Sequence, residues 1–107
     1  MKKDFGNYTI WYKEGTDILH REDGPAIEYA NGDKSWYKEG KLHRLDGPAC
    51  EYANGNKFWY KEGKRHRLDG PAIKWADGYT KWYVEDVLYK NVNSLEELII
   101  KMIIEWI

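Results

Sequence analysis

One motif recurs along the chain and limits what the chain can fold into. Trp-Tyr begins at residues 11, 36, 59 and 82, so that successive copies lie 25, 23 and 23 residues apart. Between these dipeptides, His-Arg is followed after one variable residue by Asp-Gly-Pro-Ala, and then by Asn-Gly or Asp-Gly. A unit of about 23 residues that occurs three times indicates a repeat architecture, in which each unit packs mainly against its neighbours.

The residues of each unit predict a β-hairpin. Asn31-Gly32 is typical of a two-residue type I′ turn, because both central positions of that turn need a positive φ. The flanking segments, Ala26–Ala30 and Asp33–Lys38, are short and rich in aromatic residues, as strands are. We expect Gly40 and its equivalents to end the second strand of each hairpin.

A two-residue turn also predicts the pairing across the hairpin. Counting outward pairs Ile27 with Trp36 and Glu28 with Ser35. The equivalent pairs in the later units are Cys50 with Trp59 and Ile73 with Trp82. An aliphatic or thiol side chain opposite a tryptophan makes a suitable core pair. We therefore expect the Trp face to point inward, with Cys50 as a small buried side chain, and the Glu28 face to point outward.

A single hairpin is only marginally stable in water, so the units must stack. We expect a mainly β fold in which tandem hairpin repeats form an elongated twisted sheet or solenoid; a partly closed barrel is the alternative. Met1–Thr9 fits a degenerate half-unit with its turn near Gly6-Asn7. The chain is expected to form a single domain over residues 1–107, with repeats over 1–90 and a C-terminal helix over 91–107 that caps one end.

The helix is predicted from Leu95 to the C-terminus, where Ser94 and Glu97 form a capping box. On this helix Glu97, Lys101 and Glu105 form one narrow polar stripe. Nearly all its other residues are apolar, although a capping helix needs only one apolar face. Either the helix is deeply buried on its own sheet, or the excess surface forms a homodimer. The residues expected to carry that self-association are Ile99, Ile103 and Trp106.

Three histidines recur once per unit, at His20, His43 and His66, each with an aspartate three positions on. Such residues could ligate a metal or form a His–Asp base. A catalytic site is a single asymmetric group of residues, however, and no further Cys or His completes a tetrahedral metal site. We expect Arg–Asp and His–backbone hydrogen bonds that order the loops across neighbouring units. The sequence therefore predicts no enzyme, no metal site and no cofactor.

The residues expected to bind a partner follow from strand alternation. The Trp and Tyr of each pair should point to opposite faces, with the Trp row in the core and the Tyr row exposed. Tyrosine is common at the centre of protein interfaces, and a lysine follows three of these four tyrosines, as Lys13, Lys38 and Lys61. The predicted partner-binding residues are Tyr37, Lys38, Tyr60, Lys61, Glu28 and Glu51. The alternative is a small-ligand or nucleic-acid binder that uses the Tyr/Lys strip, although a net charge of −1 does not favour nucleic acid.

The residues WYKEGKLHRLDGPACEYANG resemble the MORN-type repeat, in the variant found in bacterial antitoxin-like and phage-encoded proteins. The resemblance covers roughly residues 8–90 and implies short hairpins laid side by side into an elongated curved sheet. Members of the wider family act as scaffolds and adaptors, and some associate with phospholipids. This chain has HRxDGPA where the eukaryotic repeat has HGxG, which is a reason not to extend the phospholipid association to it.

Together these features predict a non-catalytic protein-binding module. The repeat type further suggests a phage or mobile-element protein that binds and inhibits a host component, such as a defence nuclease or a toxin. No secretory signal follows Met1, and no apolar stretch is long enough to span a membrane. We therefore expect a cytoplasmic protein, in the host cell if it is phage-encoded, with no membrane partner.

Overall fold

The computed structural model describes residues 1–106, and side chains as far as residue 104. The strands are β1 (Lys2–Asp4), β2 (Tyr8–Trp11), β3 (Ile27–Tyr29), β4 (Lys34–Ser35), β5 (Tyr37–Lys38), β6 (Lys41–Leu42), β7 (Cys50–Glu51), β8 (Lys57–Phe58), β9 (Tyr60–Lys61), β10 (Lys64–Arg65), β11 (Ile73–Lys74), β12 (Thr80–Val84) and β13 (Val87–Tyr89), followed by the helix α1 (Leu95–Trp106).

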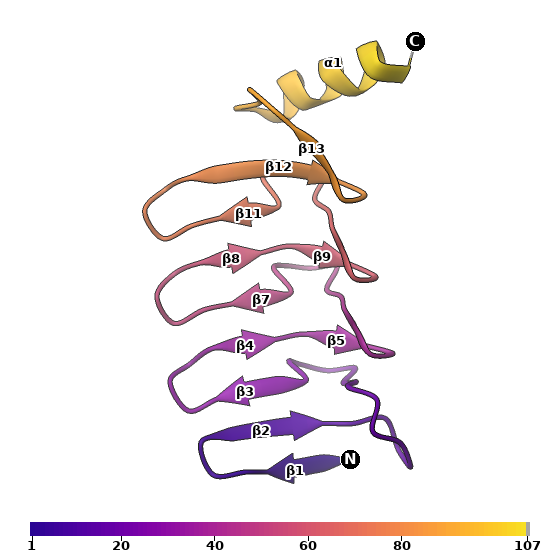
Figure 1. The fold of residues 1–107 in the computed structure, drawn as a ribbon, viewed down its shortest axis with the longest axis vertical. Helices are drawn as coiled ribbons and strands as arrows, with labels where there is room; N and C mark the ends of the chain where they lie inside the picture. Colours follow the sequence, from indigo (N-terminus) through magenta and orange to yellow (C-terminus); the bar gives the residue numbers. More distant parts are fainter. Residues whose placement is uncertain (107) are drawn as a thin grey trace.

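Nine of these strands form one antiparallel sheet in the order β1-β2-β3-β4-β7-β8-β11-β12-β13. Its two edge strands, β1 and β13, lie at opposite ends of the molecule, so the described residues form an open sheet and not a closed barrel (Figure 1). The molecule measures 48 × 30 × 17 Å, which is elongated and thin. The predicted mainly β fold of hairpin repeats in an extended sheet, with one C-terminal helix, is confirmed.

Each full unit contains two hairpins, where we had expected one. In the second unit the long hairpin β3–β4 leads directly into a short hairpin, β5–β6, which projects at the other side of the sheet (Figure 1). The short hairpin turns at Glu39-Gly40, whose φ angles are 51° and 78°. Two positive φ angles define the type I′ turn, so Gly40 forms this turn and does not end a strand.

The turn of the long hairpin has three residues and not two. The Tyr29 N–H donates to the Asp33 carbonyl at 2.9 Å, and the Gly32 N–H donates to the Tyr29 carbonyl at 3.0 Å. Gly32 has a φ of 100°, whereas Asn31 keeps a negative φ and accepts the Asp33 N–H on its Oδ1. This geometry is a type I turn followed by a left-handed glycine.

The extra turn residue shifts the pairing by one position, and the predicted register is therefore wrong. Ile27 pairs with Ser35 and Glu28 pairs with Lys34. The same shift pairs Cys50 with Phe58 and Ile73 with Lys81. A one-residue shift exchanges the faces of a strand, so Glu28 lies on the Trp face instead of opposite it.

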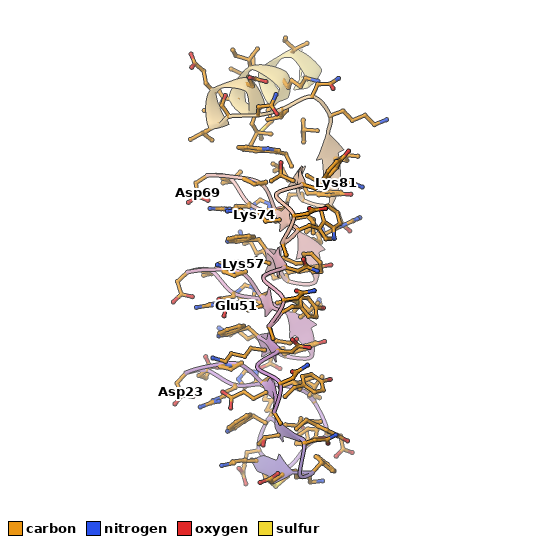
Figure 2. The ribbon with its side chains drawn as sticks, turned by 90° about the vertical axis from the view of Figure 1, so that its left-hand side faces the viewer. Asp23, Glu51, Lys57, Asp69, Lys74 and Lys81 are labelled. Carbon is orange, nitrogen blue, oxygen red and sulfur yellow. The ribbon has the colours of Figure 1, made fainter. Side chains whose placement is uncertain are left out.

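The two faces of the sheet can now be named. The loop face carries Trp11, Trp36, Trp59 and the Asp-Gly-Pro loops at 23–25, 46–48 and 69–71. The tyrosine face carries Tyr37, Tyr60 and the residues Ile27, Cys50 and Ile73. In Figure 2, Asp23 and Asp69 lie on the same side of the ribbon, which is the loop face.

Burial differs from the predicted core of tryptophans and surface of tyrosines. In the first three units both rows are half-buried, and only Trp82 and Tyr83 are buried. The cause is the single layer of sheet, which leaves each face in contact with solvent. The most deeply buried residues of the repeats are the alanines of Asp-Gly-Pro-Ala, at Ala26, Ala49 and Ala72. Cys50 is buried, as predicted.

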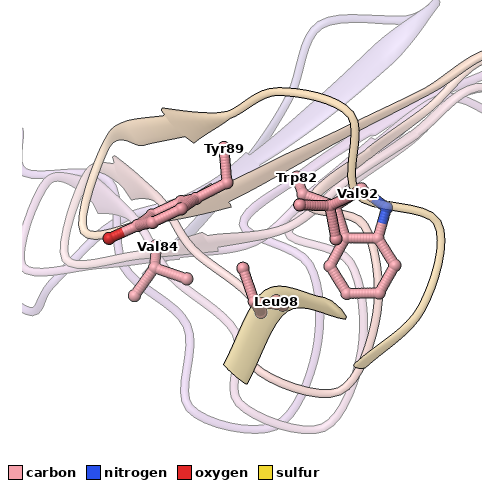
Figure 3. Packing of buried hydrophobic residues seen from close by; sticks show 5 residues of the cluster. All are labelled: Trp82, Val84, Tyr89, Val92 and Leu98. Carbon is pink, nitrogen blue, oxygen red and sulfur yellow. The ribbon is translucent and has the colours of Figure 1, made fainter. Parts of the chain in front are cut away.

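Both ends of the array match their predictions. At the first, β1 and β2 form a half-unit hairpin that turns at Gly6, where φ is 90°. At the second, the Ser94 hydroxyl accepts the Glu97 N–H at 3.2 Å and begins α1. The helix packs through Leu98 onto a cluster formed by Trp82, Val84, Tyr89 and Val92 (Figure 3).

The type I′ turn of the short hairpin predicts how substitutions at its two central positions change the stability of the protein. Gly63→Ala should lower the free energy of unfolding by about 1 kcal/mol, because an alanine is strained in the left-handed conformation. The neighbouring space is open, with the nearest atom 3.8 Å from an added Cβ, so packing adds nothing to this cost. Glu62→Asn, at a φ of 50°, should be neutral or slightly stabilising. Urea denaturation of the two variants measures both effects, and unchanged stability of Gly63→Ala would contradict the turn.

Candidate functional site

Arginine and tryptophan side chains stack along the loop face and explain the HRxDGP motif. The Arg44 guanidinium carbon lies 3.8 Å from the ring centroid of Trp36, and its equivalents Arg21 and Arg67 lie at 3.9 and 4.0 Å from their own tryptophans. Arg44 Nε donates to Asp46 at 3.0 Å, and Nη1 donates to the Pro48 carbonyl at 3.0 Å. Gly47 leaves room for the guanidinium, since an added Cβ would lie 2.9 Å from it. The arginine, aspartate and glycine of the motif therefore each have a structural role.

The histidines join successive units. Nδ1 of His20, His43 and His66 accepts the backbone N–H of Glu39, Glu62 and Glu85, respectively, at 2.9 to 3.0 Å. Each acceptor lies one unit before its donor, and each donor is the glutamate held at a positive φ in a short hairpin. The predicted His–backbone and Arg–Asp hydrogen bonds are confirmed. No three His, Cys, Asp or Glu side chains of the described residues converge as metal ligands.

A second type of hydrogen bond joins successive units, from a backbone N–H to a turn side chain of the unit before. Asp33 Oδ1 accepts the Ala53 N–H at 2.8 Å, and Asn56 Oδ1 accepts the Ala76 N–H at the same distance in the next unit. Near the end of the array, Arg65 Nε donates to Asp86 Oδ1 at 2.7 Å. This hydrogen bond lowers the pKa of the Asp86 carboxyl and raises the pKa of Arg65.

The structure divides the six predicted partner-binding residues between the two faces. Tyr37 and Tyr60 lie on the tyrosine face, where burial raises the pKa of both phenols and the nearby Cys50 thiol raises it further. Lys38 and Lys61, one position on, lie on the loop face, because successive residues of a strand alternate. The predicted strip of tyrosines and lysines is therefore not one surface.

The two predicted glutamates also lie on the loop face, beside the stacked arginines. Glu51 Oε1 is 3.1 Å from Arg44 Nη1, and Glu28 Oε1 is 3.6 Å from Arg21 Nη1. The equivalent position beside Arg67 is Lys74, so this ion pair is absent there. These glutamates support the loop face in two units, which leaves them less free to contact a partner.

A row of aromatic side chains on the tyrosine face was missed by the sequence reasoning. The ring centroids of Tyr52 and Phe58 lie 5.4 Å apart, Phe58 and Trp75 6.2 Å, and Trp75 and Tyr79 6.1 Å. Tyr29, Tyr52 and Tyr79 remain 44, 39 and 68% exposed. The signal that could have found this row is the three-residue turn, because it places Tyr29 and Tyr52 on the same face as Tyr37 and Tyr60.

The helix α1 also presents unpartnered apolar surface. Leu98 faces the sheet and is 1% exposed, whereas Ile99 and Ile103 are about half exposed, at 48 and 56%. Of the two alternatives, deep burial of the whole helix is therefore wrong. Trp106 is the last residue of α1, and its side chain lies outside the described part of the chain. Self-association through these residues stays a prediction.

Comparison with protein-family models, curated proteins and solved structures finds no match to the chain. The resemblance to MORN-type repeats stays a prediction that rests on the repeated residues themselves. Among the residues that the structure describes, no helix combines the length and the apolar content needed to cross a membrane.

The arginine stack predicts strong coupling between an arginine and the glycine beside it. A Cβ at Gly70 would lie 2.6 Å from Arg67 Cζ, so Gly70→Ala should displace the guanidinium and cost about 2 kcal/mol. In an Arg67→Ala background, Gly70→Ala should lower the free energy of unfolding by only a few tenths of a kcal/mol, because the guanidinium with which the new Cβ would clash is absent. Urea denaturation of the four proteins measures this coupling. Additive effects would show that the arginine is not held against the glycine.

The exposed helix surface predicts self-association. Light scattering at rising concentration should reveal a species of twice the chain mass, and Ile99→Glu with Ile103→Glu should convert it to the monomer. Leu45→Glu with Leu68→Glu introduces the same two charges at exposed leucines on the loop face and should leave the dimer intact. A wild-type chain that stays monomeric at high concentration would refute the prediction.

Proposed function

We propose that the chain is a non-catalytic protein-binding module that holds its partner on the tyrosine face. The observation that carries this proposal is the aromatic surface of that face, formed by the row Tyr52, Phe58, Trp75 and Tyr79 and by Tyr29, which no second layer of the described structure covers. Its tyrosines Tyr29, Tyr52 and Tyr79 are between 39 and 68% exposed. Tyrosine and tryptophan supply large contact area with little conformational entropy to lose, and they dominate the binding energy of protein interfaces.

The roles of the polar residues support a binding module over an enzyme. The three histidines each accept a backbone N–H, and the three arginines each hold a loop. These groups occur identically in successive units, whereas catalysis needs one asymmetric set of residues. The residues that look reactive in the sequence are thus used to join the units.

The resemblance to phage-encoded and antitoxin-like repeats extends the proposal to a role. The partner is a host component, such as a defence nuclease or a toxin, and binding inhibits it in the cytoplasm. This step rests on the resemblance of the repeat alone. A nucleic-acid or small-ligand site built from tyrosines and lysines together is not favoured, because Tyr37 and Lys38 lie on opposite faces.

Affinity capture from a lysate of the source organism tests the proposal. The tagged chain should recover a protein in stoichiometric amount, and Tyr29→Ser with Tyr52→Ser should reduce that recovery at least tenfold. Leu45→Ser with Leu68→Ser removes exposed apolar side chains from the loop face and serves as the matched control, with recovery unchanged. Circular dichroism confirms that the variants fold. If the tyrosine variants retain the partner, the tyrosine face does not bind it.

A further inference from the structure

Two similar clefts lie on the loop face, between successive Asp-Gly-Pro loops. The first lies between Arg21–Pro25 and His43–Asp46, with Trp36 and Lys38 in its lining, and has a volume of about 550 Å³. The second lies between the Arg44 and Arg67 loops, with Trp59 and Lys61 in its lining, and measures about 560 Å³. Apart from Tyr37, which lies between Trp36 and Lys38 in the chain and also lines the first cleft, no lining residue belongs to the tyrosine face on which the proposed function rests.

The loops that bound the clefts carry apolar side chains that the scaffold does not use. Leu45 lines both clefts and is 77% exposed, and Leu68 lines the second cleft and is 54% exposed. They occupy the variable position of HRxDGP, where the first unit has Glu22. The second cleft therefore opens between two leucines, which suits an uncharged side chain of a ligand.

The distance between the two clefts indicates which backbone conformation a peptide ligand needs in order to reach both. Each unit adds two neighbouring strands to the sheet, so the clefts repeat every ~9.5 Å. A polyproline II helix has three residues per turn and advances about 9.3 Å per turn, which places residues i and i+3 on one side at this spacing. An extended strand would turn residue i+3 to the opposite side. An α-helix presents one face every ~5.4 Å turn, and its residues i and i+7 lie ~10.5 Å apart, so neither spacing matches the clefts as closely.

The exposed aspartates at the tips of the Asp-Gly-Pro loops indicate which ligand residues fit between positions i and i+3. The side chains of Asp23, Asp46 and Asp69 are 85, 86 and 81% exposed, while their arginine partners are only 21 to 23% exposed. The tips therefore present carboxylates to a ligand. Lys38 and Lys61 line the clefts themselves, so a cationic side chain fits over a tip and not inside a cleft.

We propose that the loop face binds a basic, proline-rich segment of a protein in the polyproline II conformation. A proline or aliphatic side chain enters each cleft at positions i and i+3, and a lysine or arginine between them pairs with Asp46. This is a second binding surface, on the opposite side of the sheet from the proposed partner site. Its presence or absence leaves the proposed function unchanged.

Titration with a synthetic peptide tests this proposal. The probe is the nonapeptide (Pro-Pro-Arg)₃, followed by NMR on the full chain. It should bind with a Kd below about 1 mM and shift the methyl signals of Leu45 and Leu68 and the indole signals of Trp36 and Trp59. Leu45→Ser with Leu68→Ser should weaken binding at least fivefold. Asp46→Asn, which keeps an oxygen for Arg44, should weaken it about threefold and reduce its dependence on salt.

Three controls separate this site from simpler explanations. A peptide with a glycine inserted after each arginine has a period of four and should bind at least fivefold more weakly. Equal binding of that peptide, or of a helical peptide with the same charge, would overturn the proposal. Tyr29→Ser with Tyr52→Ser should leave the affinity for the nonapeptide unchanged. Absence of binding at 1 mM peptide, or signal shifts confined to the tyrosine face, would also overturn it.

Discussion

The stacking of an arginine on a tryptophan is the contact on which each unit depends. A sheet that is 17 Å thick has no deep interior, so ordinary hydrophobic burial cannot hold its loops. Each guanidinium lies on an indole ring within 4.0 Å and also binds a carboxylate and a carbonyl of its own loop. Because arginine is planar and always charged, it can satisfy all of these partners at once, which a lysine could not.

This arrangement also decides which surfaces are available for function. On the loop face, the tryptophans, arginines and histidines make contacts that stabilise the fold. Only the loop tips and the clefts of this face remain available to bind a ligand. The tyrosine face is held by cross-strand packing and leaves Tyr29, Tyr52 and Tyr79 exposed to solvent. The two faces therefore differ in chemistry, although every unit contributes to both.

Much of this structure could be predicted from the repeat, because its copies align without ambiguity. The hairpin units, the half-unit at Met1–Thr9, the capped helix and the structural histidines all follow from residue spacing. The faces could not be predicted, because Asn-Gly is compatible with a turn of either two or three residues. A single extra turn residue moved Glu28 to the Trp face. Lys38 is separated from Tyr37 by the alternation of successive strand residues, which the predicted Tyr/Lys strip did not take into account. The second hairpin at Glu39-Gly40 was missed because glutamate is an uncommon residue at a positive φ.

The contacts between units recur with equivalent partners along the chain. His20 accepts from Glu39 and His43 accepts from Glu62, while the Arg21 N–H donates to Tyr37 and the Arg44 N–H donates to Tyr60, so each unit offers the same acceptors and donors to the next. A unit inserted into the middle of the array would find both sets of partners already in place. The chain can therefore be lengthened or shortened by whole units of 23 residues without any new type of contact. Evolution by duplication would then change the reach of the molecule while its ends stayed the same.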